Sequence, residues 1–255
     1  MTGAAAVPTG AVAPPAVATR WAVVDVARGV AILAVVAFHL IWDLGDLGYL
    51  DWQINAHRSG KVAGRVIAGS FLALVGVSLV LAHGRGIRWR RFWRREAQLV
   101  VLALAVTAFS WFYQRDELVT FGILHAIAVV SVLTVGFVTL RPVFAYAAAL
   151  VALALPWVVH LPGRSPWVSW TGLAEGSRPS LDWQPLLPWI ALTLLAIGLT
   201  RQVVAASYEP EGWAHRLRIW HPGDPVTRAL AVTGRHTLSI YLLHQPVLYG
   251  LLSLG

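Results

Sequence analysis

The chain contains no cysteine. This absence excludes disulfide bonds, a thiolate nucleophile and zinc sites built on cysteine. Covalent or acid–base chemistry must therefore use histidine, aspartate, glutamate, serine, threonine, tyrosine or lysine. Lysine is also nearly absent, because Lys61 is the only one and almost all basic residues are arginine. Together with the abundance of alanine and valine, this usage indicates a GC-rich bacterial genome.

Charged residues are scarce as well. They make up 13% of the chain, whereas 57% of the residues are hydrophobic, and an ordinary soluble domain has about 25% charged residues. Several apolar segments approach or exceed the ~20 residues needed to cross a bilayer. The composition excludes a soluble globular domain and predicts an all-α protein, a polytopic transmembrane helical bundle.

Hydropathy predicts about seven membrane spans. They cover residues 21–42, 62–82, 97–113, 121–140, 143–159, 185–204 and 229–253. The basic run 83–96, "HGRGIRWRRFWRRE", is expected to be a cytoplasmic loop by the positive-inside rule. This orientation puts the N-terminus in the cytoplasm and residues 43–60 outside, in a multi-pass protein of the bacterial inner membrane. The loop also explains much of the net charge of +8, so we expect no nucleic-acid partner.

The N-terminus lacks the features of a cleaved signal peptide. Residues 1–20 have no basic start followed by an apolar core, and they predict a disordered tail. A single transmembrane domain is expected over residues 21–255. In its second span, small residues are expected to let neighbouring helices approach closely. They are Gly64, Ala68, Gly69, Gly76 and Ser78.

The first span carries ionisable residues on one face. Arg28 and His39 are eleven residues apart, and eleven steps of ~100° return to within about 20° of the same direction. Asp25 and Asp43 lie on this face too, one turn beyond each end. Charges in a spanning helix are costly and indicate a functional site. The alternative is a structural ion pair of Asp25 with Arg28, while His39 and Asp43 cap the outer end.

Later spans offer partners for this face. His125 is expected in the outer half of the fourth span, and Tyr241 and His244 share a face of the seventh. With His39 they predict a polar substrate chamber. A single histidine in a membrane more often forms a hydrogen bond between helices, and that alternative stays open. The sequence has no motif with metal-ligand spacing, such as H-E-x-x-H, so we expect no metal.

Five segments resemble a known family. In order, they are "VDVARGVAILAVVAFHLIWDLGDLGYL", "IAGSFLALVGVSL", "TFGILHAIAVVS", "DWQPLLPWIAL" and "GRHTLSIYLLHQPVL". They are similar to bacterial small membrane proteins grouped with the heparan-alpha-glucosaminide N-acetyltransferase catalytic domain. The resemblance extends from Trp21 to Leu252. Arg28, ten further residues and His39 also resemble a pattern of the broader membrane acyltransferase superfamily that modifies surface glycans.

The resemblance implies a transmembrane acyltransferase. Acetyl-CoA or another acyl-CoA would donate its acyl group to an amine or hydroxyl of a cell-envelope carbohydrate, an amino sugar or a similar acceptor. Arg28 would bind the donor, His39 would act as general base, and Asp43 would orient its imidazole. The larger lysosomal relative has an asparagine in place of His39 and a catalytic histidine in the first outer loop, where His57 is the nearest counterpart. The alternative function is a non-catalytic membrane carrier of a small anion or acylated glycan.

Overall fold

The structure, a computed structural model, describes residues 20–113, 115–163, 165–176, 180 and 182–254. Residues 1–19 of the expected tail lie outside the described residues. The α-helices are α1 (Ala22–Asp46), α2 (Arg58–His83), α3 (Trp89–Tyr113), α4 (Ile123–Thr134), α5 (Pro142–Val158), α6 (Pro166–Ser169), α7 (Ile190–Ala206), α8 (Trp213–Ile219), α9 (Pro225–Arg235) and α10 (Thr237–Leu252). Three 3-10 helices connect some of them, namely η1 (Ile54–Ala56), η2 (Arg115–Glu117) and η3 (Val135–Val138).

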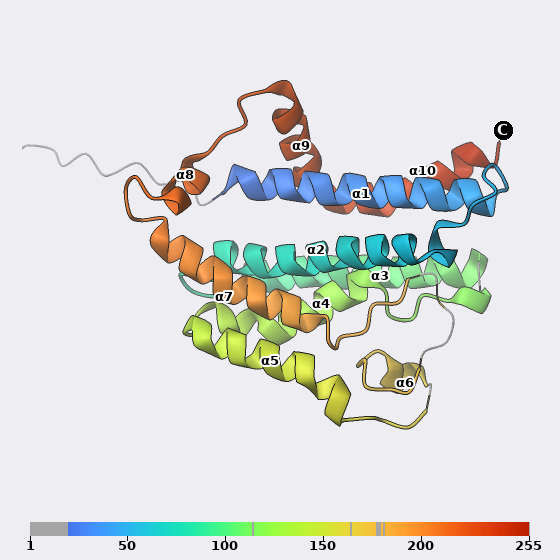
Figure 1. The fold of residues 1–255 in the computed structure, drawn as a ribbon, viewed down its shortest axis with the longest axis horizontal. Helices are drawn as coiled ribbons and strands as arrows, with labels where there is room; N and C mark the ends of the chain where they lie inside the picture. The colour runs from blue at the N-terminus through green and yellow to red at the C-terminus, as the bar shows by residue number, and fades with distance from the viewer. Residues whose placement is uncertain (1–19, 114, 164, 177–179, 181, 255) are drawn as a thin grey trace, which may run out of the picture.

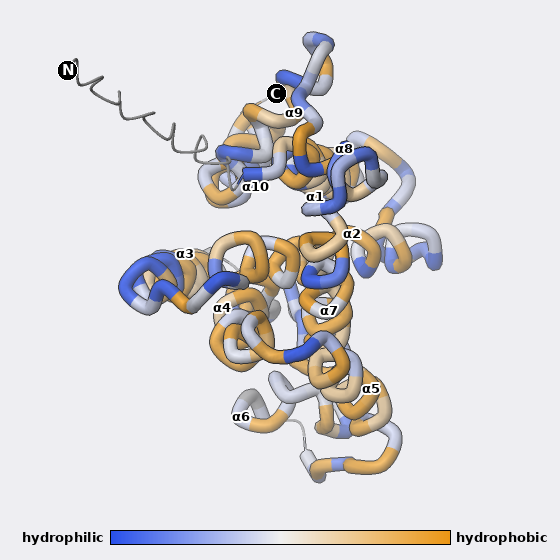
Figure 2. The backbone as a smooth tube through the Cα atoms, turned by 90° about the vertical axis from the view of Figure 1, so that its left-hand side faces the viewer, coloured by the Kyte–Doolittle hydropathy of each residue, from blue (hydrophilic) through white to orange (hydrophobic). Residues whose placement is uncertain are grey.

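The long helices form two groups, which Figure 1 shows from the side and Figure 2 end-on. One group contains α1, α9 and α10, and the larger group contains α2, α3, α4, α5 and α7. The main cluster of buried apolar residues belongs to the larger group, whereas α10 has no fully buried residue. α1 packs against α9, α10 and α2, and so contacts both groups.

The all-α prediction is confirmed. Within the described residues, three helices are long and apolar enough to cross a membrane: Ala22–Asp46, Arg58–His83 and Trp89–Phe112. The segments Ile123–Val138 and Pro142–Val158 are apolar but shorter, as is α7. The total of seven spans and the cytoplasmic N-terminus stay predictions.

The basic run 83–96 is mostly helix, so the prediction of a loop over its whole length is wrong. α2 ends at His83 and α3 begins at Trp89, which leaves only a short turn. Arginine is a good helix former, and Phe92 is buried between the rings of Trp89 and Trp93, with centroids 6.0 and 5.2 Å away. This aromatic packing explains why the helix starts among the arginines. Figure 2 shows the hydrophilic start of α3 at the end of the molecule that faces the viewer.

The predicted span over 229–253 is divided into two helices. α9 ends at Arg235 and α10 begins at Thr237. In Figure 1, α9 stands across α1, whereas α10 runs beside it. The start of α9 is fixed by Asp224, whose carboxylate accepts a hydrogen bond from the backbone amide of Thr227 at 3.0 Å. α10 alone is therefore the part of this segment that lies along α1.

Glycine allows α9 and α1 to meet backbone to backbone. A Cβ atom at Gly29 would overlap the carbonyl group of Leu230, and one at Gly234 would overlap the carbonyl group of Asp25. No side chain larger than hydrogen fits at either position without movement of the backbone. The crossing of α9 over α1 thus depends on this glycine pair.

The prediction of close helix packing at the second span is confirmed at Gly76. A Cβ atom there would overlap the backbone of Thr193 on α7. The hydroxyl of Thr193 in turn donates to the carbonyl of Leu72 on α2, with 2.7 Å between the oxygens. The two helices are therefore joined by direct packing and by a hydrogen bond between a side chain and the backbone.

We predict that Gly234→Ala destabilises the protein. The added methyl group must push the α9 backbone away from Asp25, and overpacking of this kind costs about 1–3 kcal/mol. Gly250→Ala is a matched control on α10, because a Cβ atom there would have nothing within 4 Å. Thermal unfolding of the purified variants in detergent should give a lower Tm for Gly234→Ala only. An unchanged Tm for Gly234→Ala would contradict the backbone contact.

Candidate functional site

The ionisable face of α1 points into the bundle. Asp25, Val35 and Asp43 are buried. The side chain of Arg28 is 29% exposed, and His39 is half-buried. The face predicted from the eleven-residue spacing is therefore turned inward, with an arginine near one end, a histidine near the other and apolar residues between them. Along the helix axis the two are ~16 Å apart.

Arg28 is held by a carboxylate and a hydroxyl. Asp25 accepts hydrogen bonds from Arg20, at 2.7 and 3.1 Å, and from Arg28, at 2.9 Å. A second nitrogen of Arg28 donates to the hydroxyl of Ser78 on α2, at 2.7 Å. The structural ion pair considered from the sequence is thus present. Arg28 also links α1 to the larger helix group through Ser78.

At the other end of this face, His39 lies against His244 of α10. Their ring centroids are 5.0 Å apart, and the rings meet edge to face. The ring of Trp42 stacks on His39 with a centroid distance of 6.2 Å. Nδ1 of His39 and Nε2 of His244 are both buried without a hydrogen-bond partner among the described residues. Buried polar atoms are normally satisfied, so this pair has capacity for a further polar group.

Asp43 also contacts α10. Its Oδ1 accepts a hydrogen bond from the side-chain amide of Gln245 at 2.8 Å. In the described part of the chain no hydrogen bond joins Asp43 to His39, so the expected orienting contact between them is not made directly. The second oxygen of Asp43 and the carbonyl oxygen of Gln245 are buried and unpartnered. Asp43 thus holds α10 at the position that brings His244 to His39.

Tyr241 connects α10 to the larger helix group through Asp182. The Tyr241 hydroxyl donates to the Asp182 carboxylate, which also accepts from the backbone amide of Ile123 at 2.7 Å. Asp182 therefore caps the N-terminus of α4, where a negative charge is favoured. Burial nevertheless raises the pKa of Asp182 to about 6, although these two donors oppose the shift.

His125 lies in the first turn of α4. Its Nε2 is 3.2 Å from the hydroxyl of Thr107 on α3, and its Nδ1 accepts from the backbone amide of Gly122 at 3.3 Å. The ring also packs on Phe121, with 5.9 Å between centroids. These contacts fit a histidine that joins two helices. His125 is connected to the histidine pair only indirectly, since the N-terminus of α4 also carries Asp182 and, through it, Tyr241.

His57 is exposed just before α2. Its Nδ1 is 2.9 Å from the backbone carbonyl of Gln53, and its ring lies 5.2 Å from that of Trp52. No contact between His57 and His39 is found among the described residues. The two candidate bases therefore have different surroundings, one at the exposed end of the bundle and one partly buried between α1 and α10.

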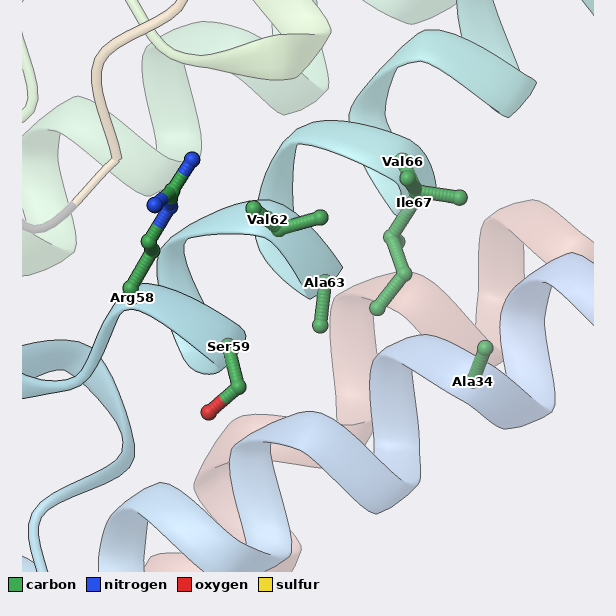
Figure 3. A pocket seen from close by; sticks show the side chains of 7 residues that line it. All are labelled: Ala34, Arg58, Ser59, Val62, Ala63, Val66 and Ile67. Atoms are coloured by element: carbon green, nitrogen blue, oxygen red, sulfur yellow. The ribbon is translucent and has the colours of Figure 1, made fainter.

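Two grooves adjoin the middle of α1. The first, between α1 and α2, is lined by Ala34, Arg58, Ser59, Val62, Ala63, Val66 and Ile67. Figure 3 shows Ser59 and Ala63 turned toward α1, while Arg58 points away from it. The second groove is lined by Val36, Ser239, Ile240, Leu243, His244, Val247 and Leu248. Since His244 borders the second groove, the histidine pair lies close to the surface on the α10 side.

Two polar residues of this site were missed in the sequence. Asp182 lies in the segment "DWQPL" before α7, and Gln245 follows His244 in "LLHQP". A carboxylate directly before an apolar span and an amide inside one were the available signals. Neither could be paired with Tyr241 or Asp43 without knowledge of how the helices pack. No three His, Asp or Glu side chains of the described residues gather to hold a metal ion, and the absence of a metal stays a prediction.

Comparison with known proteins gave one match. The model of a family described as "Heparan-alpha-glucosaminide N-acetyltransferase, catalytic" matches residues 20–246. The match includes Arg28, His39, the Asp182 segment and the part of α10 that carries His244. Searches of curated proteins and of solved structures found no match.

We predict a pH-dependent stability that originates at Asp182. Its ordinary pKa is 3.8 and its folded-state pKa is about 6, so the folded protein binds a proton between these values that the unfolded chain has released. Stability should therefore fall as the pH rises from about 4 to about 6. Asp182→Asn keeps the acceptor for Ile123 but cannot ionise, so Tm should depend less on pH. Thermal unfolding in detergent at pH 4.5, 6 and 7.5 measures this.

The matched control for that experiment is Asp51→Asn, at an exposed loop position. It should keep the pH dependence of the wild type. Tyr241→Phe removes a donor to the ionised carboxylate and should make the fall in Tm steeper. If Asp182→Asn keeps the wild-type fall in Tm, another group causes it.

Proposed function

The chain belongs to the heparan-alpha-glucosaminide N-acetyltransferase catalytic-domain family, and from this premise we propose that it is an acyl-CoA-dependent membrane acyltransferase. The proposed donor is acetyl-CoA or another acyl-CoA, and the proposed acceptor is an amine or hydroxyl of a cell-envelope carbohydrate. The observation that carries the proposal is the pair of His39 and His244, each with an unpartnered ring nitrogen. His39 lies on the same face of α1 as Arg28.

The proposed reaction is direct transfer with His39 as general base. The nitrogen or oxygen of the acceptor attacks the thioester carbonyl carbon and forms the new amide or ester bond, its proton passes to His39, and the carbon–sulfur bond breaks to release the CoA thiolate. A positioned histidine contributes about 10²- to 10⁴-fold to such a step. The imidazole of His244, 5.0 Å away between centroids, offers a second nitrogen to the acceptor or to the proton.

Asp43 and Arg28 have different proposed roles. Asp43 acts through Gln245, because that hydrogen bond fixes α10 beside α1. Arg28 binds the donor, since its planar guanidinium is suited to phosphate and carbonyl oxygens and its side chain is partly accessible. Tyr241 and His244 form one wall of the proposed acceptor chamber, and His125 supports the N-terminus of α4 behind Asp182.

Two alternatives are kept. The first places the base at His57, in the outer loop, as implied by the lysosomal relative. The exposure of His57, and the partial burial of His39 beside a second histidine, favour His39. The second is a carrier that moves a small anion or acylated glycan without chemistry, for which unpartnered polar groups in the bundle would also serve as a binding site.

The proposed topology gives the two substrates different sides. Seven spans with a cytoplasmic N-terminus, in the bacterial inner membrane, put Arg28 near the cytoplasmic donor and His39 near an external acceptor. The support is the arginine-rich start of α3, which the positive-inside rule assigns to the cytoplasm. The hydrophilic residues there and in α8 lie at the same end of the molecule (Figure 2).

We predict the sidedness of two exposed positions. A membrane-impermeant maleimide should label Asp51→Cys in intact cells but label Arg90→Cys only after the membrane is opened. Because the chain has no cysteine, the unmodified protein gives the blank. Labelling of Arg90→Cys in intact cells would reverse the topology and remove the assignment of Arg28 to the donor side.

We predict that His39→Gln lowers acyl transfer by about 10²- to 10⁴-fold. The variant should fold and still bind acyl-CoA, because glutamine keeps a polar group at this position and Arg28 is unchanged. The wild-type rate should fall on acidification, since a protonated imidazole cannot accept the acceptor's proton. The measurement is transfer of labelled acetyl from acetyl-CoA to a panel of amino sugars and envelope glycans in liposomes.

Two histidine variants serve as controls for that assay. His57→Ala and His125→Ala should each retain most of the activity at similar expression. If His39→Gln is active and His57→Ala is not, the base lies in the outer loop. Uptake of a labelled acceptor by the liposomes without transfer of the acetyl group would support the carrier instead.

A further inference from the structure

A second polar cluster lies on α3, near the basic end of the bundle, and the proposed mechanism does not use it. Glu96 is 2% exposed, although it belongs to a helix rich in arginine. Its Oε1 accepts a hydrogen bond from Arg95 at 2.9 Å, and Arg95 also reaches the hydroxyl of Ser131 on α4, at 3.5 Å. Oε2 of Glu96 is buried without a partner.

Arg95 lies at the same end of the bundle as Arg28. α2 ends at His83 and α3 begins at Trp89, and the ring of His83 lies 5.9 Å from that of Phe92 on α3. Counted back from this contact along the two helices, Ser78 on α2 and Arg95 on α3 are at about the same level. Because Arg28 donates to Ser78, the two arginines come from different helix groups to the same level of the bundle.

Positive charge exceeds negative charge in this region. Two carboxylates, Asp25 and Glu96, face three guanidinium groups, from Arg20, Arg28 and Arg95. The side chain of Arg28 is 29% exposed and that of Arg95 is 41% exposed. Both guanidinium groups are therefore accessible to a ligand, and water screens their charges only in part. Like charges near an apolar bundle repel strongly, and an anion between them would turn this repulsion into attraction.

We propose that Arg28 and Arg95 together bind the phosphate groups of the acyl-CoA donor. Glu96 is a positioning residue in this proposal, because its Oε1 fixes the guanidinium of Arg95. From this site the acyl arm would run along the apolar part of the α1 face toward His39. The inference rests on the proposed function and adds a second anion-binding residue, on another helix, to Arg28.

The test compares binding of CoA with binding of pantetheine, which lacks the nucleotide and its phosphates. Arg95→Gln should weaken CoA binding by about 10-fold or more, since it removes one charge partner of the phosphates, and leave pantetheine binding unchanged. Arg94→Gln is the matched control: it removes the same charge from the neighbouring, exposed position on α3 and should change CoA affinity less than 2-fold. Calorimetry on the purified full chain in detergent measures both ligands.

Further variants separate binding from folding. Arg95→Lys keeps the charge and should fold, with CoA affinity between those of the wild type and Arg95→Gln. Glu96→Gln should weaken CoA binding less than Arg95→Gln, because the arginine remains. Arg28→Lys should also weaken CoA binding, as expected for the second half of the same anion site.

The outcomes distinguish this inference from the proposed function. If the wild type binds CoA and Arg95→Gln binds it equally well, Arg95 is no part of the donor site, while the acyltransferase proposal stands. If Arg95→Gln loses CoA and pantetheine to the same degree, Arg95 has only a structural role and the inference is overturned. If the wild type binds neither ligand and transfers no label, the acyltransferase proposal itself fails.

Discussion

Asp25 is the residue through which α1 is tied to both α2 and α9. Its oxygens hold Arg20 and Arg28, and Arg28 reaches across to Ser78 of α2. The backbone carbonyl of the same aspartate lies against Gly234, so that α9 crosses α1 at this turn. An ion pair among apolar helices is retained only if every partner is satisfied. This arrangement therefore fixes α1 relative to both helix groups and sets the position of everything further along α1.

The two ends of the α1 face differ in how far the protein satisfies its own polar groups. Near Asp25, each charged group has a partner from the chain. Near His39, four buried polar atoms have none among the described residues: Nδ1 of His39, Nε2 of His244, Oδ2 of Asp43 and Oε1 of Gln245. Unsatisfied buried groups cost free energy, which a bound polar molecule would recover. The end of the face near Asp25 is thus satisfied by the chain itself, whereas the end near His39 keeps polar groups that could accept further hydrogen-bond partners.

Features that depend on a single helix were predicted correctly from the sequence, whereas contacts between two helices were not. The inward face of α1 follows from periodicity, and it was correct from Asp25 to Asp43. The hydrogen bonds between Asp43 and Gln245 and between Tyr241 and Asp182 join residues far apart in the chain, so no local pattern contains them. The start of α3 was misplaced because hydropathy treats arginine as a loop residue, whereas its helix propensity and the packing of Phe92 extend the helix.

The weak burial of α10 gives the outer site a specific physical character. No residue of α10 is fully buried, although Leu238 and Tyr241 pack against the main apolar cluster. Polar contacts add to this packing, from Gln245 to Asp43 and from Tyr241 to Asp182, together with a hydrogen bond from the Tyr49 hydroxyl to the carbonyl of Leu252 at 2.9 Å. Helices with few buried apolar contacts open most readily. The helix that carries His244 is therefore held less firmly than α1, which is fixed at Asp25.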